Sequence, residues 1–123
     1  MKKYGLIGKS LGHSFSRRFF EAHFKSLEID ATYDLLEIQS IDRVIPFLKG
    51  GYQGLNVTVP YKETILPFLD ELSPEALAIG AVNTVVFKEG STIGYNTDSY
   101  GFQQAIKPFL TFEHERALIL GTG

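Results

Sequence analysis

Apolar and polar side chains alternate most clearly in the middle of the chain, over residues 53–59. The alternating residues are, in order, Leu55, Asn56, Val57, Thr58 and Val59. A two-residue period is typical of a β-strand, and Pro60 should end the ladder because proline has no N–H to donate. This central strand therefore delivers polar side chains, with Lys62 just beyond them, to one corner of the fold.

Shorter apolar runs predict further strands on both sides of the central one. They cover residues 4–7, 32–38, 81–87 and 92–95, and a last buried-type run, 116–120, precedes Gly121. The four residues between the third and fourth of these runs include Glu89-Gly90. A short polar turn of this kind joins antiparallel strands, so we expect a hairpin there.

Helical spacing or helix-start signals mark residues 17–27, 40–49 and 74–79, and a last helix that starts at residue 97 or 98 and runs to 107. Ser16 should cap the first helix. The third begins with Ser73-Pro74-Glu75, a capping hydroxyl followed by a proline and an acid. Pro46 lies inside the second and should delay or kink it, because proline removes a hydrogen bond and clashes one turn back.

The alternation of strands and helices predicts an α/β domain with three layers, in which helices cover both faces of a mixed, mainly parallel sheet. The hairpin adds one antiparallel strand to that sheet. In such sheets ligands bind outside the carboxyl ends of the strands, which is where we look for a site.

Composition narrows the classes of function. Twelve basic residues nearly balance fourteen acidic ones, so we expect no nucleic-acid or membrane partner. The chain has no cysteine, which excludes disulfides, thiolate catalysis and cysteine-based zinc sites. The three histidines show no metal-ligand spacing, so no metal site is expected. No apolar run approaches the roughly 20 residues of a membrane span, and we expect a soluble, cytoplasmic protein.

Polar side chains collect at the predicted strand ends and in the loops beside them. They are Ser14, Ser16, Asn56, Thr58, Lys62, Asn83, Thr84, Asn96 and Asp98. Hydroxyl, amide, ammonium and carboxylate groups together suit a small, oxygen-rich molecule.

Lys62 and Asp98 are the candidates for chemistry. A lysine can donate or accept a proton at a carbon being reduced or oxidised, and an adjacent carboxylate can orient it. The alternative is a solvated lysine and a helix cap. Similarly, Ser14 and Ser16 suit a carboxylate but could instead cap a helix and bond the backbone. The polar residues at the strand ends could equally satisfy neighbouring backbone groups.

The terminal Gly121-Thr122-Gly123 follows a predicted strand and matches the first half of a dinucleotide-binding glycine turn. The helix that would receive the pyrophosphate is absent from these 123 residues. We therefore interpret Gly121 and Gly123 as the start of an incomplete cofactor site.

Five motifs in order resemble those of the shikimate dehydrogenases. They are residues 8–16 (GKSLGHSFS), 54–62 (GLNVTVPYK), 79–85 (IGAVNTV), 94–101 (GYNTDSYG) and 120–123 (LGTG). The resemblance spans the whole chain. It implies a shikimate/substrate-binding domain in residues 1–100, followed in residues 101–123 by a linker helix and the first strand of a truncated dinucleotide-binding (Rossmann) domain.

The resemblance also implies an activity: NADP-dependent interconversion of 3-dehydroshikimate and shikimate, in aromatic amino-acid biosynthesis. Carried over residue by residue, Lys62 would be the catalytic acid/base, paired with Asp98. Ser14 and Ser16 would hold the substrate carboxylate. Four residues would contact the ring hydroxyls, namely Asn56, Thr58, Asn83 and Asp98.

Some features depart from the family or lie outside its core pattern. Arg17 and Phe20-Glu21 stand where the family usually has proline and His-Asn, so the loop carrying Ser16 could be set differently. The chain alone should be inactive. Residues 116–120 would be a strand with a bare edge, which either packs on the first domain, pairs with another copy or is disordered.

Two alternative functions stay open. One is a quinate/shikimate dehydrogenase, and the other is a non-catalytic hydroxy-acid binding module.

Overall fold

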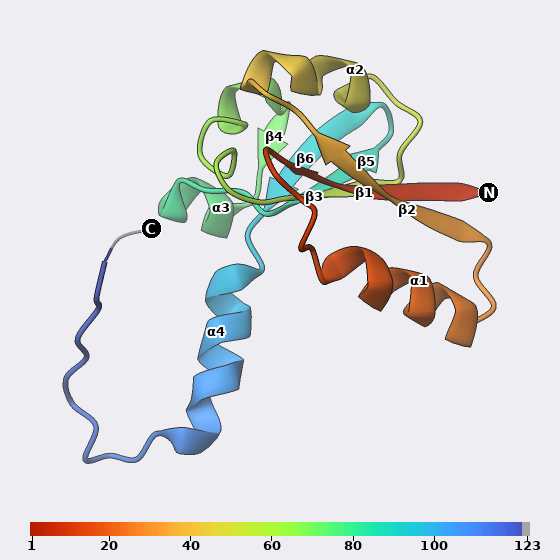
Figure 1. Cartoon of the computed structure of the whole chain (residues 1–123). Coiled ribbons are helices and arrows are strands. Elements are labelled where there is room, and N and C mark those ends of the chain that lie inside the picture. The colour runs from red at the N-terminus through yellow and green to blue at the C-terminus, as the bar shows by residue number, and fades with distance from the viewer. Residues whose placement is uncertain (122–123) are drawn as a thin grey trace.

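The computed structural model describes residues 1–121 (Figure 1). Its strands are β1 (Lys2–Gly8), β2 (Ala31–Glu37), β3 (Gly54–Val57), β4 (Glu71–Leu72), β5 (Thr84–Lys88) and β6 (Ser91–Tyr95). Its α-helices are α1 (Ser16–Ser26), α2 (Ile45–Leu48), α3 (Pro74–Ile79) and α4 (Asp98–Ile106). Short 3₁₀ turns cover Ile41–Val44, Leu66–Phe68 and Lys107–Phe109.

Within the described residues the strands form one six-stranded sheet in the order β2-β1-β3-β5-β6-β4. The pairs β1–β2, β1–β3 and β4–β6 are parallel, whereas β5 runs antiparallel to both β3 and β6. Figure 1 shows α1 and α2 on opposite faces of the sheet. The predicted three-layer α/β fold, with a mixed and mainly parallel sheet, is confirmed.

Each face of the sheet has its own apolar cluster, because successive strand residues point to opposite sides. In β1, Leu6 packs with Phe24 of α1 and Tyr33 of β2. The next residue, Ile7, is fully buried in a larger cluster on the other face, with Val57 of β3 among its members. These two clusters fix the register of the central strands and hence the positions of the polar residues at their ends.

The delayed helix start predicted from Pro46 is observed, whereas the predicted cap of α1 is wrong. Residues 40–49 form a 3₁₀ turn followed by the four-residue helix α2, with Pro46 in its first turn, where a missing N–H costs nothing. Ser16 is not the cap of α1 but its first residue. The Oγ of Ser14 accepts a hydrogen bond from the Ser16 N–H at 3.2 Å, so Ser14 supplies the side-chain oxygen at this end.

The central strand is shorter than its alternation predicts. Thr58 still donates its N–H to the carbonyl of Ile7, but β1 ends at Gly8 and offers no further partner. Val59 is consequently 72% exposed and not a buried strand residue. β4, which the sequence did not predict, is only two residues long and pairs with β6.

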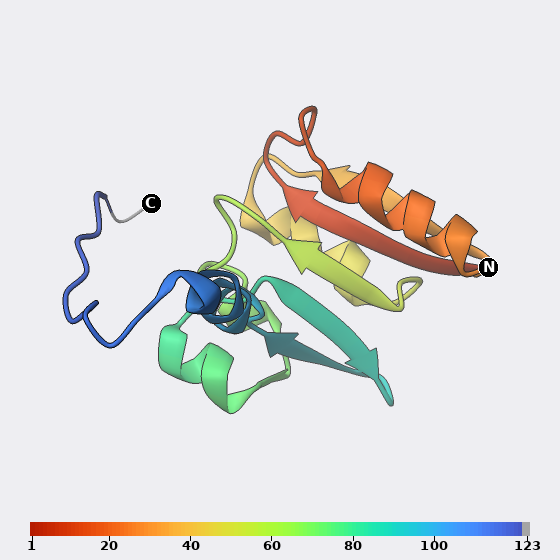
Figure 2. The same cartoon turned by 90° about the horizontal axis from the view of Figure 1, so that it is seen from below.

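The carboxyl-terminal segment leaves the sheet. Figure 1 shows α4 extending away from the sheet, and both Figure 1 and Figure 2 show residues 110–121 apart from the other elements. Residues 116–120 form no strand, and Leu118, Ile119 and Leu120 are 82–88% exposed. The prediction of a strand here is wrong for this structure: a strand needs a neighbour to receive its N–H groups, and none reaches this segment in the described part of the chain.

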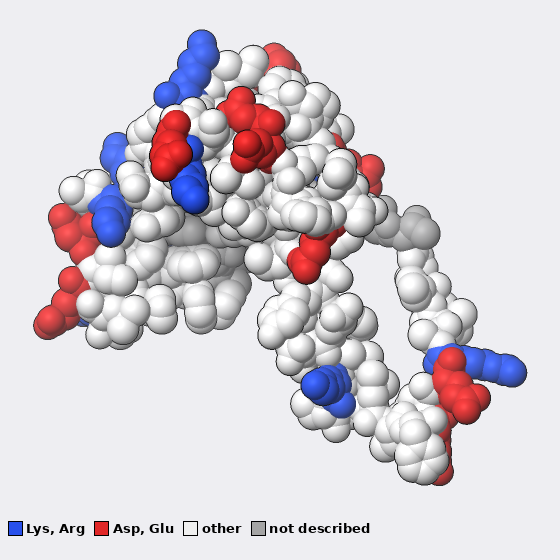
Figure 3. Space-filling model, turned by 180° about the vertical axis from the view of Figure 1, so that it is seen from behind, with Lys and Arg blue, Asp and Glu red and all other residues white. Residues whose placement is uncertain are grey.

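Charged side chains of both signs are interspersed on the face shown in Figure 3. Among the described residues, no helix has the length and apolar character needed to cross a bilayer.

Candidate functional site

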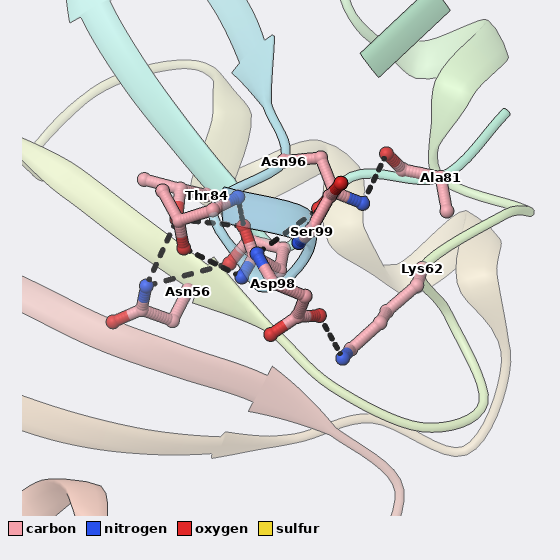
Figure 4. A network of polar contacts seen from close by, with 9 residues as sticks. Asn56, Lys62, Ala81, Thr84, Asn96, Asp98 and Ser99 are labelled. Atoms are coloured by element: carbon pink, nitrogen blue, oxygen red, sulfur yellow. Dashed lines mark hydrogen bonds and ion pairs between the residues drawn. The ribbon is translucent and has the colours of Figure 1, made fainter. Parts of the chain in front are cut away.

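Lys62 and Asp98 meet at one corner of the sheet. Lys62 lies in the turn after β3, and Asp98 is the first residue of α4. Lys62 Nζ lies 2.6 Å from Asp98 Oδ2, and Figure 4 shows the two side chains pointing toward each other. The side chains are 33% and 55% exposed. The contact predicted from the sequence is therefore formed, in a position open to solvent and to a small ligand.

The backbone holds Lys62 from two sides. Its carbonyl accepts a hydrogen bond from the Val82 N–H at 2.8 Å. The preceding residue, Tyr61, is 5% exposed, and its hydroxyl donates to the carbonyl of Ile38. The turn is thus tied both to the segment before β5 and to the segment after β2, which limits where the ammonium can lie.

Asn96 places Asp98. The Oδ1 of Asn96 accepts from the N–H groups of Asp98 and Ser99, at 3.0 and 3.2 Å, while Nδ2 donates to the carbonyl of Ala81 at 3.1 Å (Figure 4). Two otherwise unpaired N–H groups at the start of α4 are thereby satisfied. The predicted helix start at residue 97 or 98 is confirmed, but Asn96 supplies the side-chain cap.

Two asparagines join the central strand to this helix start. Asn56 Nδ2 donates to the Asn83 carbonyl and to Thr84 Oγ1, each at 3.3 Å. The side chain of Asn83 makes two hydrogen bonds with Thr97: Oδ1 accepts from its N–H at 2.9 Å, and Nδ2 donates to its Oγ1 at 2.8 Å. Both asparagines hydrogen-bond groups at strand ends, which was the alternative to a role in ligand binding. Asn83 Nδ2 uses one of its two N–H groups in these bonds and has the other as a further donor.

The remaining predicted residues lie close to the ends of β1 and β3. Thr58 packs so near Gly8 that a Cβ on that glycine would lie 2.8 Å from Thr58 Cγ2. Ser14 and Ser16 lie in the loop between β1 and α1 and at the start of that helix. Asn56 Oδ1 also accepts a hydrogen bond from the hydroxyl of Tyr33 in β2, at 2.8 Å.

A groove of about 500 Å³ opens beside this network on the α1 face of the sheet. Its lining is mostly apolar and includes Tyr4, Phe20, Phe24 and Val86, with Asn56 and Thr84 among its polar residues. Lys62, Asp98 and the two serines do not line it. Among the candidate polar residues, Asn56 and Thr84 are the ones that line this groove.

The cofactor prediction falls mainly outside what the structure tests. Gly121 is exposed and has a φ of +96°, in the left-handed region that favours glycine. Gly123 lies outside the described residues.

Sequence reasoning placed Thr84 and Asn96 among the polar residues near strand ends and Thr97 at a helix start, but it did not identify their bridging and capping roles, and it missed Tyr33. Two signals were available. An asparagine shortly before a helix start is a frequent cap, and a tyrosine in a buried strand usually finds a partner for its hydroxyl. Which atom would be that partner depends on the strand register.

Comparisons with known proteins identify relatives of this chain. Residues 6–85 match the family model of the shikimate dehydrogenase substrate binding domain. A shikimate dehydrogenase (NADP(+)) of Pyrococcus abyssi is 46% identical over 124 residues, covering 100% of this chain and 47% of the relative. The chain thus spans about half the length of such curated relatives.

Solved structures show the same similarity. Shikimate dehydrogenase 1 from Peptoclostridium difficile matches with a TM-score of 0.82 and 43% identity, over 88% of this chain and 41% of that one. Shikimate 5-dehydrogenase from Thermus thermophilus, in complex with NADP(H) and shikimate, matches with a TM-score of 0.81 and 36% identity, over 89% and 42%.

Proposed function

Because this chain belongs to the family of shikimate dehydrogenase substrate-binding domains, we propose that it is the substrate-binding portion of an NADP-dependent shikimate dehydrogenase. The whole enzyme reduces 3-dehydroshikimate to shikimate with NADPH. The observation that carries this proposal is the 2.6 Å contact between Lys62 Nζ and Asp98 Oδ2 at the corner where the polar side chains gather.

Lys62 acts as the acid/base. In the direction of reduction its ammonium donates a proton to the ketone oxygen as that oxygen gains charge, and in the reverse direction the amine takes the hydroxyl proton. Asp98 orients Nζ through the observed contact. The Asn96 cap fixes the Asp98 backbone, so the pair is held by the fold before substrate binds.

The other polar residues hold the substrate. Ser14 and Ser16 bind the substrate carboxylate. Ser14 Oγ accepts a hydrogen bond from the Ser16 N–H, so the Ser14 O–H is left as a donor. Asn56, Thr58 and Asn83 contact the ring hydroxyls, and Asp98 joins them.

When bound, NADP(H) supplies or accepts the hydride at the reacting carbon. Gly121 and Gly123 begin the turn that holds it, and most of that site belongs to the part of the relatives that this chain does not match. We therefore propose residues 1–100 as the substrate-binding domain and residues 101–123 as the linker helix and first segment of the nucleotide-binding domain.

Two further proposals concern the setting of the protein. The absence of cysteine suits the reducing cytoplasm, where we place it. The exposed apolar residues of segment 116–120 favour self-association of the isolated chain, because a bare apolar segment can pair with another copy.

A quinate dehydrogenase is the second candidate. The quinate dehydrogenase from Corynebacterium glutamicum, in complex with NAD, matches with a TM-score of 0.75 and 34% identity. Both values are lower than those of the P. difficile shikimate dehydrogenase, so shikimate is favoured. A non-catalytic binding module is disfavoured by the Lys62–Asp98 contact, since binding alone does not need a proton-transfer pair.

The test is a fusion of this chain to the remaining half of the P. abyssi relative, assayed with NADP and either shikimate or quinate. We expect NADP-dependent oxidation of shikimate, with a higher kcat/KM than for quinate, and no oxidation by the 123-residue chain alone. A preference for quinate would favour the second candidate. Activity of the chain alone would contradict the proposal that it is only the substrate-binding portion.

A further inference from the structure

Tyr33 is a buried tyrosine next to the candidate site. It lies in the middle of β2 and is 2% exposed. Its ring stacks on Phe20 of α1, with centroids 4.7 Å apart and planes inclined by 11°. It packs in an otherwise apolar cluster with Leu6 and Phe24, where an unpaired hydroxyl would be costly.

The hydroxyl of Tyr33 donates to Asn56 Oδ1 at 2.8 Å. Strand register makes this possible: Tyr4 of β1 is aligned with Tyr33 on one side and with Gly54 on the other. Asn56 is two residues beyond Gly54, so its side chain lies on the same face of the sheet.

The orientation of the Asn56 amide is determined by its partners. The carbonyl of Asn83 can only accept, so it must face Asn56 Nδ2. Oδ1 then points toward Tyr33, whose O–H can donate. Both Nδ2 hydrogens are used, by Asn83 and Thr84, and the group left for a ligand is a second lone pair of Oδ1.

We infer that Tyr33 is a positioning residue of the substrate site, which holds Asn56 so that its Oδ1 accepts a hydrogen bond from a substrate hydroxyl. This inference rests on the proposed function. Tyr33 does not itself touch substrate in this account; it acts through Asn56.

Burial also affects the ionisation of the Tyr33 hydroxyl. Burial raises the pKa of Tyr33 to about 12, while a hydrogen bond with the side chain of Ser16 acts in the opposite direction. The hydroxyl therefore stays protonated at neutral pH and remains a donor to Asn56. Tyr33 thus links α1, through its stacking on Phe20, to the end of β3, through its hydrogen bond to Asn56.

The test removes only the hydroxyl. Tyr33→Phe keeps the ring and its stacking on Phe20. Tyr52→Phe is a matched control, because the Tyr52 hydroxyl also donates to a side-chain oxygen, Asp34 Oδ2 at 3.0 Å, but contacts no proposed substrate residue through that bond. Shikimate is titrated into each ¹⁵N-labelled chain, and the Asn56 side-chain NH₂ resonances are followed with and without shikimate.

We expect Tyr33→Phe to bind shikimate about three- to tenfold more weakly, the loss typical of one hydrogen bond, and to lose the distinct Asn56 NH₂ resonances before shikimate is added. Tyr52→Phe should match the native chain in both respects. A double-mutant cycle with Asn56→Ala then separates positioning from a general loss of structure. If Tyr33 acts through Asn56, the double variant binds no more weakly than Asn56→Ala alone.

Three results would count against these claims in different ways. Native affinity in Tyr33→Phe, with native Asn56 resonances, would overturn the inference and leave the proposed function standing. Additive losses in the double variant would overturn action through Asn56. A native chain that does not respond to shikimate would overturn the proposed function, and with it any role of Tyr33 in binding.

Discussion

At the scale of single residues, much of the site's geometry depends on side chains that cap or bridge rather than on those that would touch a ligand. Asn96 is 7% exposed and makes three hydrogen bonds, two to the start of α4 and one to Ala81. The position of Asp98 relative to Lys62 is set by this cap, because it fixes the backbone from which the carboxylate projects.

Removing the cap should therefore affect both stability and binding. We predict that Asn96→Ala lowers the free energy of unfolding by about 1–2 kcal/mol and weakens shikimate binding. Ser73→Ala is the matched control: Ser73 Oγ accepts from the Ala76 N–H at 3.1 Å and caps α3. That variant should lose about 1 kcal/mol with unchanged affinity. Thermal denaturation and shikimate titration measure the two effects. If Asn96→Ala and Ser73→Ala lost affinity for shikimate equally, the Asn96 cap would have no special role in binding.

At the scale of elements, the end of β1 is packed against the loops that carry candidate residues. A Cβ at Gly8 would lie 2.5 Å from Leu11 Cδ2 and 2.8 Å from Thr58 Cγ2, and both distances are too short for real contacts. At Gly12 a Cβ would meet no atom within 4 Å.

We predict that Gly8→Ala destabilises the chain by about 1–3 kcal/mol, because Leu11 or Thr58 must move, and that the displacement of Thr58 also weakens shikimate binding. Gly12→Ala should stay within about 0.5 kcal/mol of native. Chemical denaturation of the three proteins measures this. A Gly8→Ala variant as stable as Gly12→Ala would mean that the packing at this strand end is looser than described.

The short edge strand β4 is held by a carboxylate just before it. Asp70 Oδ2 accepts from the N–H and the Oγ1 of Thr92 in β6, at 2.8 and 3.0 Å. These hydrogen bonds hold the pKa of Asp70 below its usual value of 3.8. A carboxyl group whose pKa is lowered by folding stabilises the fold above its unfolded pKa, and this stabilisation is lost as the pH falls through the folded value.

We therefore predict that native protein has a higher Tm than Asp70→Asn above about pH 4, and that the difference shrinks as the pH is lowered further. Calorimetric scans between neutral pH and about pH 3 measure it. A difference that stays constant over this range would exclude a contribution from ionised Asp70.

The elements that sequence reasoning predicted well are those whose pattern is local. The alternation at residues 53–59 located β3, and Ser73-Pro74-Glu75 located α3. The errors involve partners that are distant in sequence. Val59 is exposed and not in the strand because β1 ends at Gly8, and the unpredicted strand β4 forms because it pairs with β6. The pairing of Lys62 with Asp98 was proposed from their residue types and supported by a family resemblance, whereas the Tyr33–Asn56 bond depends on strand register that the sequence alone did not provide.

At the scale of the whole molecule, the chain combines a packed sheet with an exposed carboxyl-terminal extension. No residue of α4 is buried, and Phe112 is 92% exposed. A helix of nine residues gains little stability from its own hydrogen bonds, so this extension requires a covering surface to be stable.

We predict that the isolated chain self-associates through segment 116–120. Ile119→Lys places a charge in that segment and should reduce the association, whereas Leu77→Lys, at an exposed apolar position of α3, should not. Sedimentation analysis over a range of concentrations tests this. A monomer mass at every concentration for the native chain would contradict the proposal.

The most direct test of the central claim is the turnover of the P. abyssi fusion carrying Lys62→Ala. Loss of the Lys62 ammonium should lower kcat by about 10²–10⁴-fold, as expected for an acid/base group. The change in shikimate affinity should be much smaller. Stability should change by less than about 1 kcal/mol, because the ion pair with Asp98 is exposed. Lys49→Ala, at an exposed lysine beside α2, should keep native kcat. A Lys62→Ala fusion with native kcat would contradict the account.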